Sequence, residues 1–154
     1  MGITQIQAKE IVLLSYSEGK VTMTLYQRGL AALENKDIDQ AITCFSEAIR
    51  LNPKHFAAYV GRGAAYFERG ECDRAIEDFT TAIRLEPTAP VFFNRAFVHD
   101  RKGEYDRAIN DYSEAIRLDP NFAVAYENRA KAYRAVGEEA RAASDERQAQ
   151  QRKK

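Results

Sequence analysis

The stretch Asp73-Arg-Ala-Ile-Glu-Asp-Phe-Thr-Thr-Ala-Ile-Arg-Leu-Glu-Pro87 decides the fold of this 154-residue chain, because it recurs. Residues 39–53 and 106–120 carry nearly the same sequence. The alanine at the third position is Ala41, Ala75 and Ala108 in the three copies, and a degraded fourth copy follows at Ala142. A fixed period of about 34 residues indicates an array of helical repeats.

Each copy predicts two helices joined by a tight turn. We expect first helices at residues 22–35, 56–69, 90–102 and 123–136, and second helices at residues 38–51, 72–85, 105–118 and 139–150. Three turns carry Gly70, Gly103 and Gly137, because a residue that tolerates the left-handed conformation ends a helix at little cost. The first copy has Asn35-Lys36 there, and asparagine is the next-best residue for that conformation.

Proline marks the links between copies. Pro53, Pro87 and Pro120 lie just beyond the expected second helices, where proline stops a helix. The second copy is one residue shorter between Pro87 and Phe92. Pro90 then helps to start the third repeat.

Apolar residues in the second helices follow the i, i+1, i+4, i+7, i+8 spacing of a buried stripe. The first stripe is Ala41, Ile42, Phe45, Ala48 and Ile49, and its alanines let two helix backbones approach closely. In the fourth copy, Glu146 and Gln150 replace the aromatic residue and the last isoleucine. Because a stacked array needs a polar outer face at its end, we expect this last helix to be a solvating cap.

These residues resemble the tetratricopeptide repeat family over residues 22–150. The family's pattern falls in the second copy on Tyr59, Gly63, Tyr66, Ala75, Phe79, Ala82 and Pro87, and in the third on Phe92, Ala96, His99, Ala108, Tyr112, Ala115 and Pro120. The first and fourth copies match less completely. The resemblance implies an all-α fold, namely a right-handed superhelical solenoid of antiparallel helix pairs. Its four repeats would span residues 22–55, 56–88, 89–122 and 123–150.

Residues 1–21 and 151–154 lie outside the repeats. A short helix with an apolar face of Ile3, Ile6, Leu13 and Leu14 would cover the first repeat, with a turn at residues 17–20. The same segment also fits a strand, a disordered chain, or a segment that pairs with another copy. Residues 151–154 form a basic tail, which we interpret as a solvated end.

Charge and composition exclude several classes of protein. Lysine plus arginine and aspartate plus glutamate both number 23, so the basic surplus of a nucleic-acid or anionic-membrane binder is absent. The apolar run at residues 11–14 is too short to span a membrane and does not resemble a signal peptide. Cys44 and Cys72 fit no metal or disulfide pattern and read as free thiols. We therefore expect a cytoplasmic protein.

No group of residues in the sequence suggests catalysis, so we expect no enzyme, no cofactor and no metal. His99 occupies a packing place that is otherwise held by Ala32, Tyr66 and Tyr133, and we interpret it as a semi-buried substitute for tyrosine.

One arginine recurs in every first helix, and the facing places in the second helices are mostly aspartate. The arginines are Arg28, Arg62, Arg95 and Arg129, and the facing residues are Cys44, Asp78, Asp111 and Asp145. We expect Arg62 and Arg95 to pair with Asp78 or Asp111 and to align the helices rather than bind a ligand.

In the tetratricopeptide repeat family, the first helices line a concave groove that commonly receives an extended peptide or a helix of a partner. On this face we place a partner-binding groove made of Tyr26, Gln27, Leu30, Val60, Phe67, Phe93, Asn94, Phe97, Arg101, Glu127, Asn128, Lys131 and Arg134. Its three phenylalanines have no expected partner within the chain, and exposed aromatic clusters mark binding sites. The alternative is that the N-terminal segment or the curvature of the array covers them.

Polar residues of the same groove suggest specific contacts. Asn94 and Asn128 are expected to bind the backbone of an extended peptide, and Lys131 with Arg134 an acidic residue. One subclass of the family clamps the acidic C-terminal tail of heat-shock chaperones with lysine, asparagine and arginine. The clamp places fall here on Tyr26, Leu30, Gly61, Pro90 and Asn94, and none matches in register. This mismatch argues against a chaperone-tail adaptor.

The sequence thus predicts a non-enzymatic module that binds a partner protein of unknown identity, with no nucleic acid and no membrane. The alternative is a structural subunit that associates with itself through residues 1–21 or the end of the array.

Overall fold

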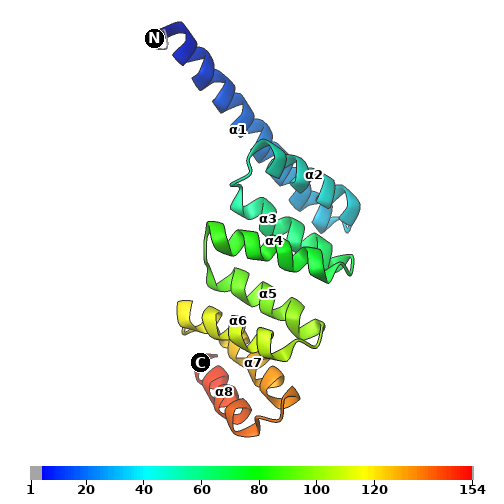
Figure 1. The fold of residues 1–154 in the computed structure, drawn as a ribbon, viewed down its shortest axis with the longest axis vertical. Coiled ribbons are helices and arrows are strands. Elements are labelled where there is room, and N and C mark those ends of the chain that lie inside the picture. Colours follow the sequence, from blue (N-terminus) through cyan, green and yellow to red (C-terminus); the bar gives the residue numbers. More distant parts are fainter. Residues whose placement is uncertain (1–4, 154) are drawn as a thin grey trace.

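The computed structural model describes the backbone of residues 5–153 and the side chains of residues 17–153. The described residues form eight helices and no strand: α1 (Gln5–Glu34), α2 (Ile38–Leu51), α3 (Phe56–Glu68), α4 (Cys72–Leu85), α5 (Ala89–Arg101), α6 (Tyr105–Leu118), α7 (Ala123–Ala135) and α8 (Glu139–Arg152). The helices stack in chain order along the long axis of the molecule, from α1 at one end to α8 at the other (Figure 1). Apart from the start of α1, the helix ends lie within two residues of those expected.

The tight turns within pairs take the left-handed conformation. Gly70, Gly103 and Gly137 have φ angles of 82°, 76° and 83°, as expected. The turn after α3 is closed by the amide of Glu71, which donates to the carbonyl of Tyr66 at 2.8 Å, so the helix end keeps its hydrogen bonds.

In the first pair, the left-handed residue is Lys36, with φ of 60°, and not Asn35. The expectation that asparagine would take this conformation was therefore wrong. The turn geometry fixes which position after α1 must be left-handed, and the sequence has lysine there.

The links between pairs also follow the sequence. The helices α2, α4 and α6 each end two residues before proline, and Pro90 lies in the first turn of α5. Both features confirm the expected action of proline as a helix stop and as a helix start.

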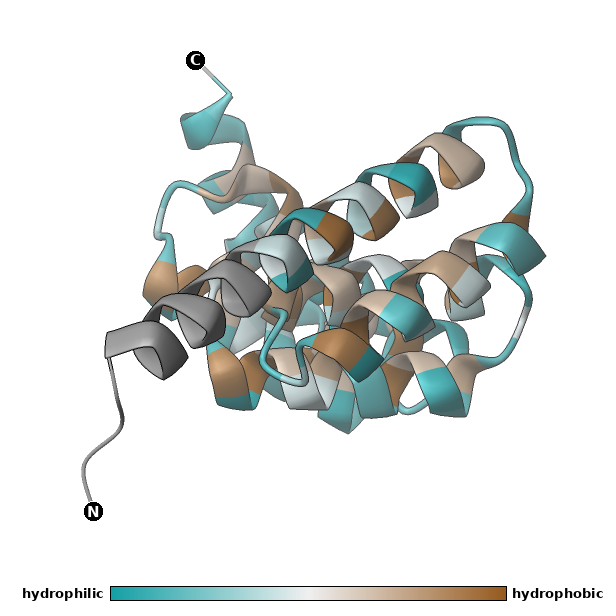
Figure 2. Ribbon diagram, turned by 90° about the horizontal axis from the view of Figure 1, so that it is seen from above, coloured by the Kyte–Doolittle hydropathy of each residue, from teal (hydrophilic) through white to brown (hydrophobic). Residues whose placement is uncertain are grey.

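The core is a column of small and aromatic residues between the helices. Ala41, Phe45 and Ala48 of α2 are fully buried, and their counterparts in α4 and α6 are equally enclosed. The ring of Phe45 fills the space beside two glycines. A Cβ atom on Gly29 or on Gly61 would lie 2.6 Å from that ring, so glycine is required at both contacts. Along each helix apolar residues alternate with hydrophilic ones, whereas the loops are mainly hydrophilic (Figure 2).

The helix α1 corrects one expectation about the N-terminal region. It runs without interruption through residues 17–20, so the expected turn there was wrong. A single glycine inside a helix costs about 1 kcal/mol and does not break it, and a Cβ on Gly19 would meet nothing within 4 Å. The proposed cover by Ile3, Ile6, Leu13 and Leu14 concerns side chains outside the described residues.

The last helix is polar on its outer side. Ala142, Asp145 and Ala149 are buried against the rest of the fourth pair, whereas Gln150, at the place of a buried stripe, is exposed. The fourth copy thus retains the small residues that contact α7 and has lost the apolar residues beyond them.

Candidate binding groove

The recurrent arginines build the joints between helix pairs. Arg62 of α3 donates from Nε and Nη2 to both carboxylate oxygens of Asp78 at 2.8 Å, and from Nη1 to Ser46 of the preceding pair at 3.1 Å. The hydrogen bonds to Asp78 raise the pKa of the Arg62 guanidinium above its usual value. One side chain thereby joins its own pair and ties it to the pair before.

The same joint occurs twice more. Arg95 bonds to Asp111 and Thr80, and Arg129 bonds to Asp145 and Ser113, at distances of 2.7–2.9 Å. The expected pairing is thus confirmed, and these arginines are used in packing. Arg28, opposite Cys44 and with no pair before it, is exposed.

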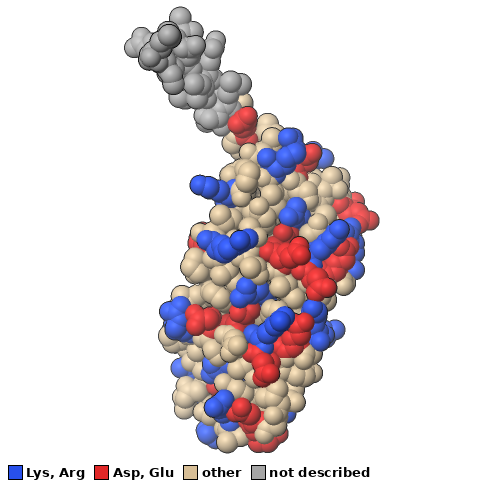
Figure 3. Space-filling view, viewed as in Figure 1, with Lys and Arg blue, Asp and Glu red and all other residues tan. Residues whose placement is uncertain are grey.

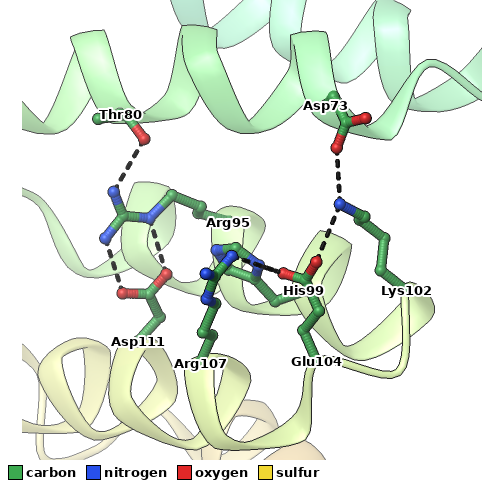
Figure 4. A network of polar contacts seen from close by, with 8 residues as sticks. All are labelled: Asp73, Thr80, Arg95, His99, Lys102, Glu104, Arg107 and Asp111. Carbon is green, nitrogen blue, oxygen red and sulfur yellow. Dashed lines mark hydrogen bonds and ion pairs between the residues drawn. The ribbon is translucent and has the colours of Figure 1, made fainter.

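A second polar network surrounds His99 (Figure 4). His99 is buried, more completely than the semi-buried position expected for it, and its Nδ1 lies 2.7 Å from Glu104 Oε2. Lys102 bridges Glu104 to Asp73 of α4, at 2.9 and 2.6 Å. Hydrogen bonds from Lys102 and His99 lower the pKa of Glu104 to about 2. The network therefore joins the second pair to the third.

An apolar pocket lies between α3 and α5, on the side of these helices away from the joints. It has a volume of about 290 Å³ and is lined by Ala64, Phe67, Glu68, Phe79, Phe93, Asn94, Phe97 and Val98. Four of these are residues that the sequence placed in the groove. The ring of Phe97 lies edge-on to Phe67, with ring centres 5.6 Å apart, and stacks with Phe93 at 6.4 Å.

The three phenylalanines do have partners within the chain, which corrects the expectation that they have none. Each is half-buried, and Phe93 also contacts Tyr112 and Phe122, with ring centres 5.5 and 5.1 Å apart. Phe93 therefore belongs partly to the core, whereas Phe67 and Phe97 are the walls of the pocket. No N-terminal cover is needed to explain this partial burial.

The two groove asparagines differ. Asn128 donates from Nδ2 to the carbonyl of Val124 in its own helix at 2.9 Å. Asn94 lines the pocket, and its side chain makes no hydrogen bond to any described residue. Only Asn94 thus has an unused amide beside the apolar walls.

The C-terminal end of the groove is charged. A second hollow there brings together Glu127, Lys131 and Arg134 with Glu146 and Lys153. Arg134 Nη1 lies 2.6 Å from Glu146, and Lys153 pairs with Glu127. Arg134 is therefore already neutralised, and Lys131 forms no ion pair with any described residue.

The remaining groove residues lie outside both hollows. Tyr26 packs against Phe45 and His55, with ring centres 5.9 and 5.2 Å apart, so it is a packing residue. Val60 is half-buried beside the core of the second and third pairs. Gln27, Leu30 and Arg101 are exposed.

The predicted groove lacks four of the eight residues that line the pocket, namely Ala64, Glu68, Phe79 and Val98. Phe79 is a core residue that also forms part of the lining, and Glu68 lies one helical turn after Ala64. The i, i+4 spacing along α3 was the signal that would have added Glu68.

Other kinds of site are not seen in the described part of the chain. It has no group of three or more potential metal ligands, and none of its helices is long and apolar enough to span a bilayer. Both cysteines are unpaired. Acidic and basic side chains are interspersed over the face drawn in Figure 3, without a large region of one sign.

Comparison with known proteins agrees with this architecture. A family model described as "Tetratricopeptide repeat" matches residues 26–90, and one described as "TPR repeat" matches residues 98–137. A search of curated protein sequences gave no match.

Solved structures share the arrangement of helix pairs at low sequence identity. The crystal structure of MamA is 22% identical, with a TM-score of 0.84, over 99% of this chain and 96% of that one. The Arabidopsis OM64 TPR domain is 23% identical, with a TM-score of 0.73, over 76% and 98%. The first TPR of Spaghetti (RPAP3), bound to the HSP90 peptide SRMEEVD, is 21% identical, with a TM-score of 0.74, over 76% and 94%. At these identities the likeness shows the fold alone.

Proposed function

Since the chain belongs to the tetratricopeptide repeat family, we propose that it is a non-enzymatic interaction module that holds a segment of a partner protein in its groove. The observation that carries this proposal is the pocket between α3 and α5. Apolar walls with a few polar groups are typical of binding sites, and aromatic residues supply much of the binding energy at interfaces.

We assign different roles in binding to the aromatic and the polar residues of the pocket. Phe67 and Phe97 would contact an apolar side chain of the partner, because their rings line the pocket and are incompletely buried. Asn94 would hydrogen-bond to the partner's backbone. Both cysteines are unpaired, which fits a reducing compartment, and we place the protein in the cytoplasm on that basis.

Affinity capture from native lysate tests the proposal by comparing the wild-type chain with Phe97→Glu. This change puts a charge into the pocket and leaves the core residue Phe93 in place. The control is Leu118→Glu, which adds the same charge to an apolar residue that is 38% exposed and lies on a second helix, α6, away from the groove residues. We expect a partner that is retained by the wild type and the control and lost with Phe97→Glu. Equal retention by all three would contradict the proposal.

The chaperone-tail mode is not part of the proposal. The five positions of the clamp hold Tyr26, Leu30, Gly61, Pro90 and Asn94, and none has the residue type that the clamp needs. If the clamp is counted from the next repeat instead, Asn94 is the one residue that matches. Tyr26 is moreover packed against Phe45 and His55.

One observation favours self-association as a second candidate function. The helix α1 carries two exposed apolar residues ahead of the groove, Val21 and Met23, which are 50% and 51% accessible. A second copy that packed on α1 would bury them. Sedimentation velocity over a range of concentrations tests this, and a mass that rises with concentration in the wild type but not in Met23→Glu would support it. A monomer at all concentrations would exclude it.

A further inference from the structure

The apolar pocket has a charged counterpart one repeat further along the groove. The lining residues Ala64, Phe67, Glu68 and Phe97 correspond, in the next copy of the repeat, to Phe97, Asp100, Arg101 and Lys131. Equivalent positions of successive repeats therefore have aromatic side chains between α3 and α5 and charged side chains between α5 and α7. Because α5 belongs to both places, one ligand that lies across α5 reaches both.

The charged site between α5 and α7, formed by Asp100, Arg101 and Lys131, has a net positive charge. Its neighbours cancel one another, since Glu127 pairs with Lys153 and Arg134 with Glu146. Neither Arg101 nor Lys131 forms an ion pair within 4 Å of a described residue.

Arg101 and Lys131 both act electrostatically on Asp100. Asp100 is half-buried, and its side chain makes no hydrogen bond to a described residue. Burial raises its pKa against the opposing effect of Lys131 and Arg101. Two cations thus face one carboxylate that is partly withdrawn from solvent, and the place attracts a further carboxylate.

The distance between the two places sets the spacing in the ligand. Packed helices lie about 8–10 Å apart, and an extended chain advances about 3.3 Å per residue. An extended ligand would therefore cross α5 in about three residues, whereas a helical ligand, which rises about 1.5 Å per residue, would need about seven. The unused amide of Asn94, on α5, favours the extended form, because only an extended chain has free backbone groups to bond.

We propose, on the basis of the proposed function, that the groove binds an extended peptide with a large apolar residue and a carboxylate about three positions apart. The apolar side chain enters the pocket between Phe67 and Phe97. The carboxylate lies against Lys131 and Arg101, and Asn94 bonds to the backbone between them. This assignment replaces Arg134, which the sequence had favoured as the partner of an acidic residue, by Arg101.

Fluorescence anisotropy with synthetic peptides tests this ligand on the full chain. The probes are labelled Gly/Ser peptides with one Phe and one Glu, placed from adjacent positions to about seven residues apart in both orders, each with a matched peptide that has Gln for Glu. We expect the tightest binding at a separation of about three residues, and about tenfold weaker binding with Gln at low salt. The preference for Glu should shrink at high salt, because the charged groups are exposed.

Charge reversal provides the matched variants. Lys131→Glu should abolish the preference for Glu and create a preference for a peptide with Lys in its place. Lys54→Glu, which reverses an exposed charge in the link between α2 and α3, should leave the preference unchanged.

The outcomes separate this inference from the proposed function. If the peptides bind through Phe and are released by Phe97→Glu, but do not distinguish Glu from Gln, the groove is a binding site and the inference is wrong. Tightest binding at about seven residues would overturn the extended form. Binding of none of the peptides would overturn the inference and count against the proposed function.

Discussion

The packing side and the groove side of the first helices change differently along the array. On the packing side, Arg62, Arg95 and Arg129 make the same pair of hydrogen bonds to aspartate, at 2.7–2.8 Å. On the groove side, the place of Phe67 is taken by Asp100 and then by Arg134. Stacking one pair on the next requires the same contacts each time, whereas recognition of a ligand requires different ones. Repetition therefore marks the residues that build the array, and variation marks those that would choose a partner.

The largest expected effect comes from breaking the repeated side. Arg95→Ala leaves Asp111, whose side chain is 10% accessible, without its counter-ion, which should cost about 3 kcal/mol in the free energy of unfolding. Arg28→Ala, at the exposed first place of the same column, should cost no more than about 0.5 kcal/mol. Urea unfolding followed by circular dichroism measures both. Equal losses would mean that the joints do not carry the stability assigned to them.

A smaller effect is expected where two glycines meet one ring. Gly61→Ala places a Cβ 2.6 Å from the buried ring of Phe45 and should cost about 1–3 kcal/mol through overpacking. Gly19→Ala, in an open part of α1, should instead stabilise the helix by about 0.5–1 kcal/mol. Thermal unfolding checks the two signs. The account would be contradicted if Gly61→Ala stabilised the protein as Gly19→Ala does.

On the groove side, a substitution should reduce partner binding strongly while it reduces the stability of the fold only slightly. Phe97→Glu removes ring contacts with Phe67 and Phe93 and should cost only about 1 kcal/mol. Its effect on partner binding should be near complete, because the new charge lies in the pocket. A variant that unfolded the array would show that Phe97 belongs to the core, as Phe93 partly does.

The smallest of the expected effects is a loss of stability on acidification. It should come from the network around Glu104 that joins the second and third pairs. The folded-state pKa of Glu104 is lowered to about 2 from 4.5, so its contribution is present above the unfolded pKa and is lost as the pH falls through that window. Glu104→Gln should remove this dependence. Melting temperatures between about pH 5 and pH 2.5 measure it, and wild type and variant should diverge least at the acid end. Parallel curves would show that Glu104 has no such role.

Much of the fold could be predicted from residues that act on the backbone near them or that recur from repeat to repeat. Glycine and proline set the helix ends because each restricts or permits particular backbone angles, and the Arg–Asp pairs followed from two recurring places that face one another. The uninterrupted course of α1 could not be predicted, because one glycine tolerates a helix or a turn equally well and only its context decides.

Less of the site could be predicted, because it depends on contacts between repeats. The partial burial of Phe93 arises from Tyr112 in α6 and Phe122 in the link before α7, and periodicity within one helix does not reveal such contacts. The ion pair between Arg134 and Glu146, and the resulting choice of Arg101, likewise required the positions of two helices in space. The sequence placed the predicted groove residues on one face of the first helices, and the structure shows an apolar hollow and a charged hollow among them.

Site-specific photocrosslinking tests the central claim most directly, namely that the groove between α3 and α5 receives a partner. p-Benzoylphenylalanine replaces Phe97 in one sample and the exposed residue Leu118 of α6 in another, and both are irradiated in native lysate. We predict a crosslink from position 97 to one partner protein, absent at position 118 and suppressed by an excess of the best-binding peptide. Crosslinks from position 97 only to a second copy of the chain, or the same products from both positions, would contradict it.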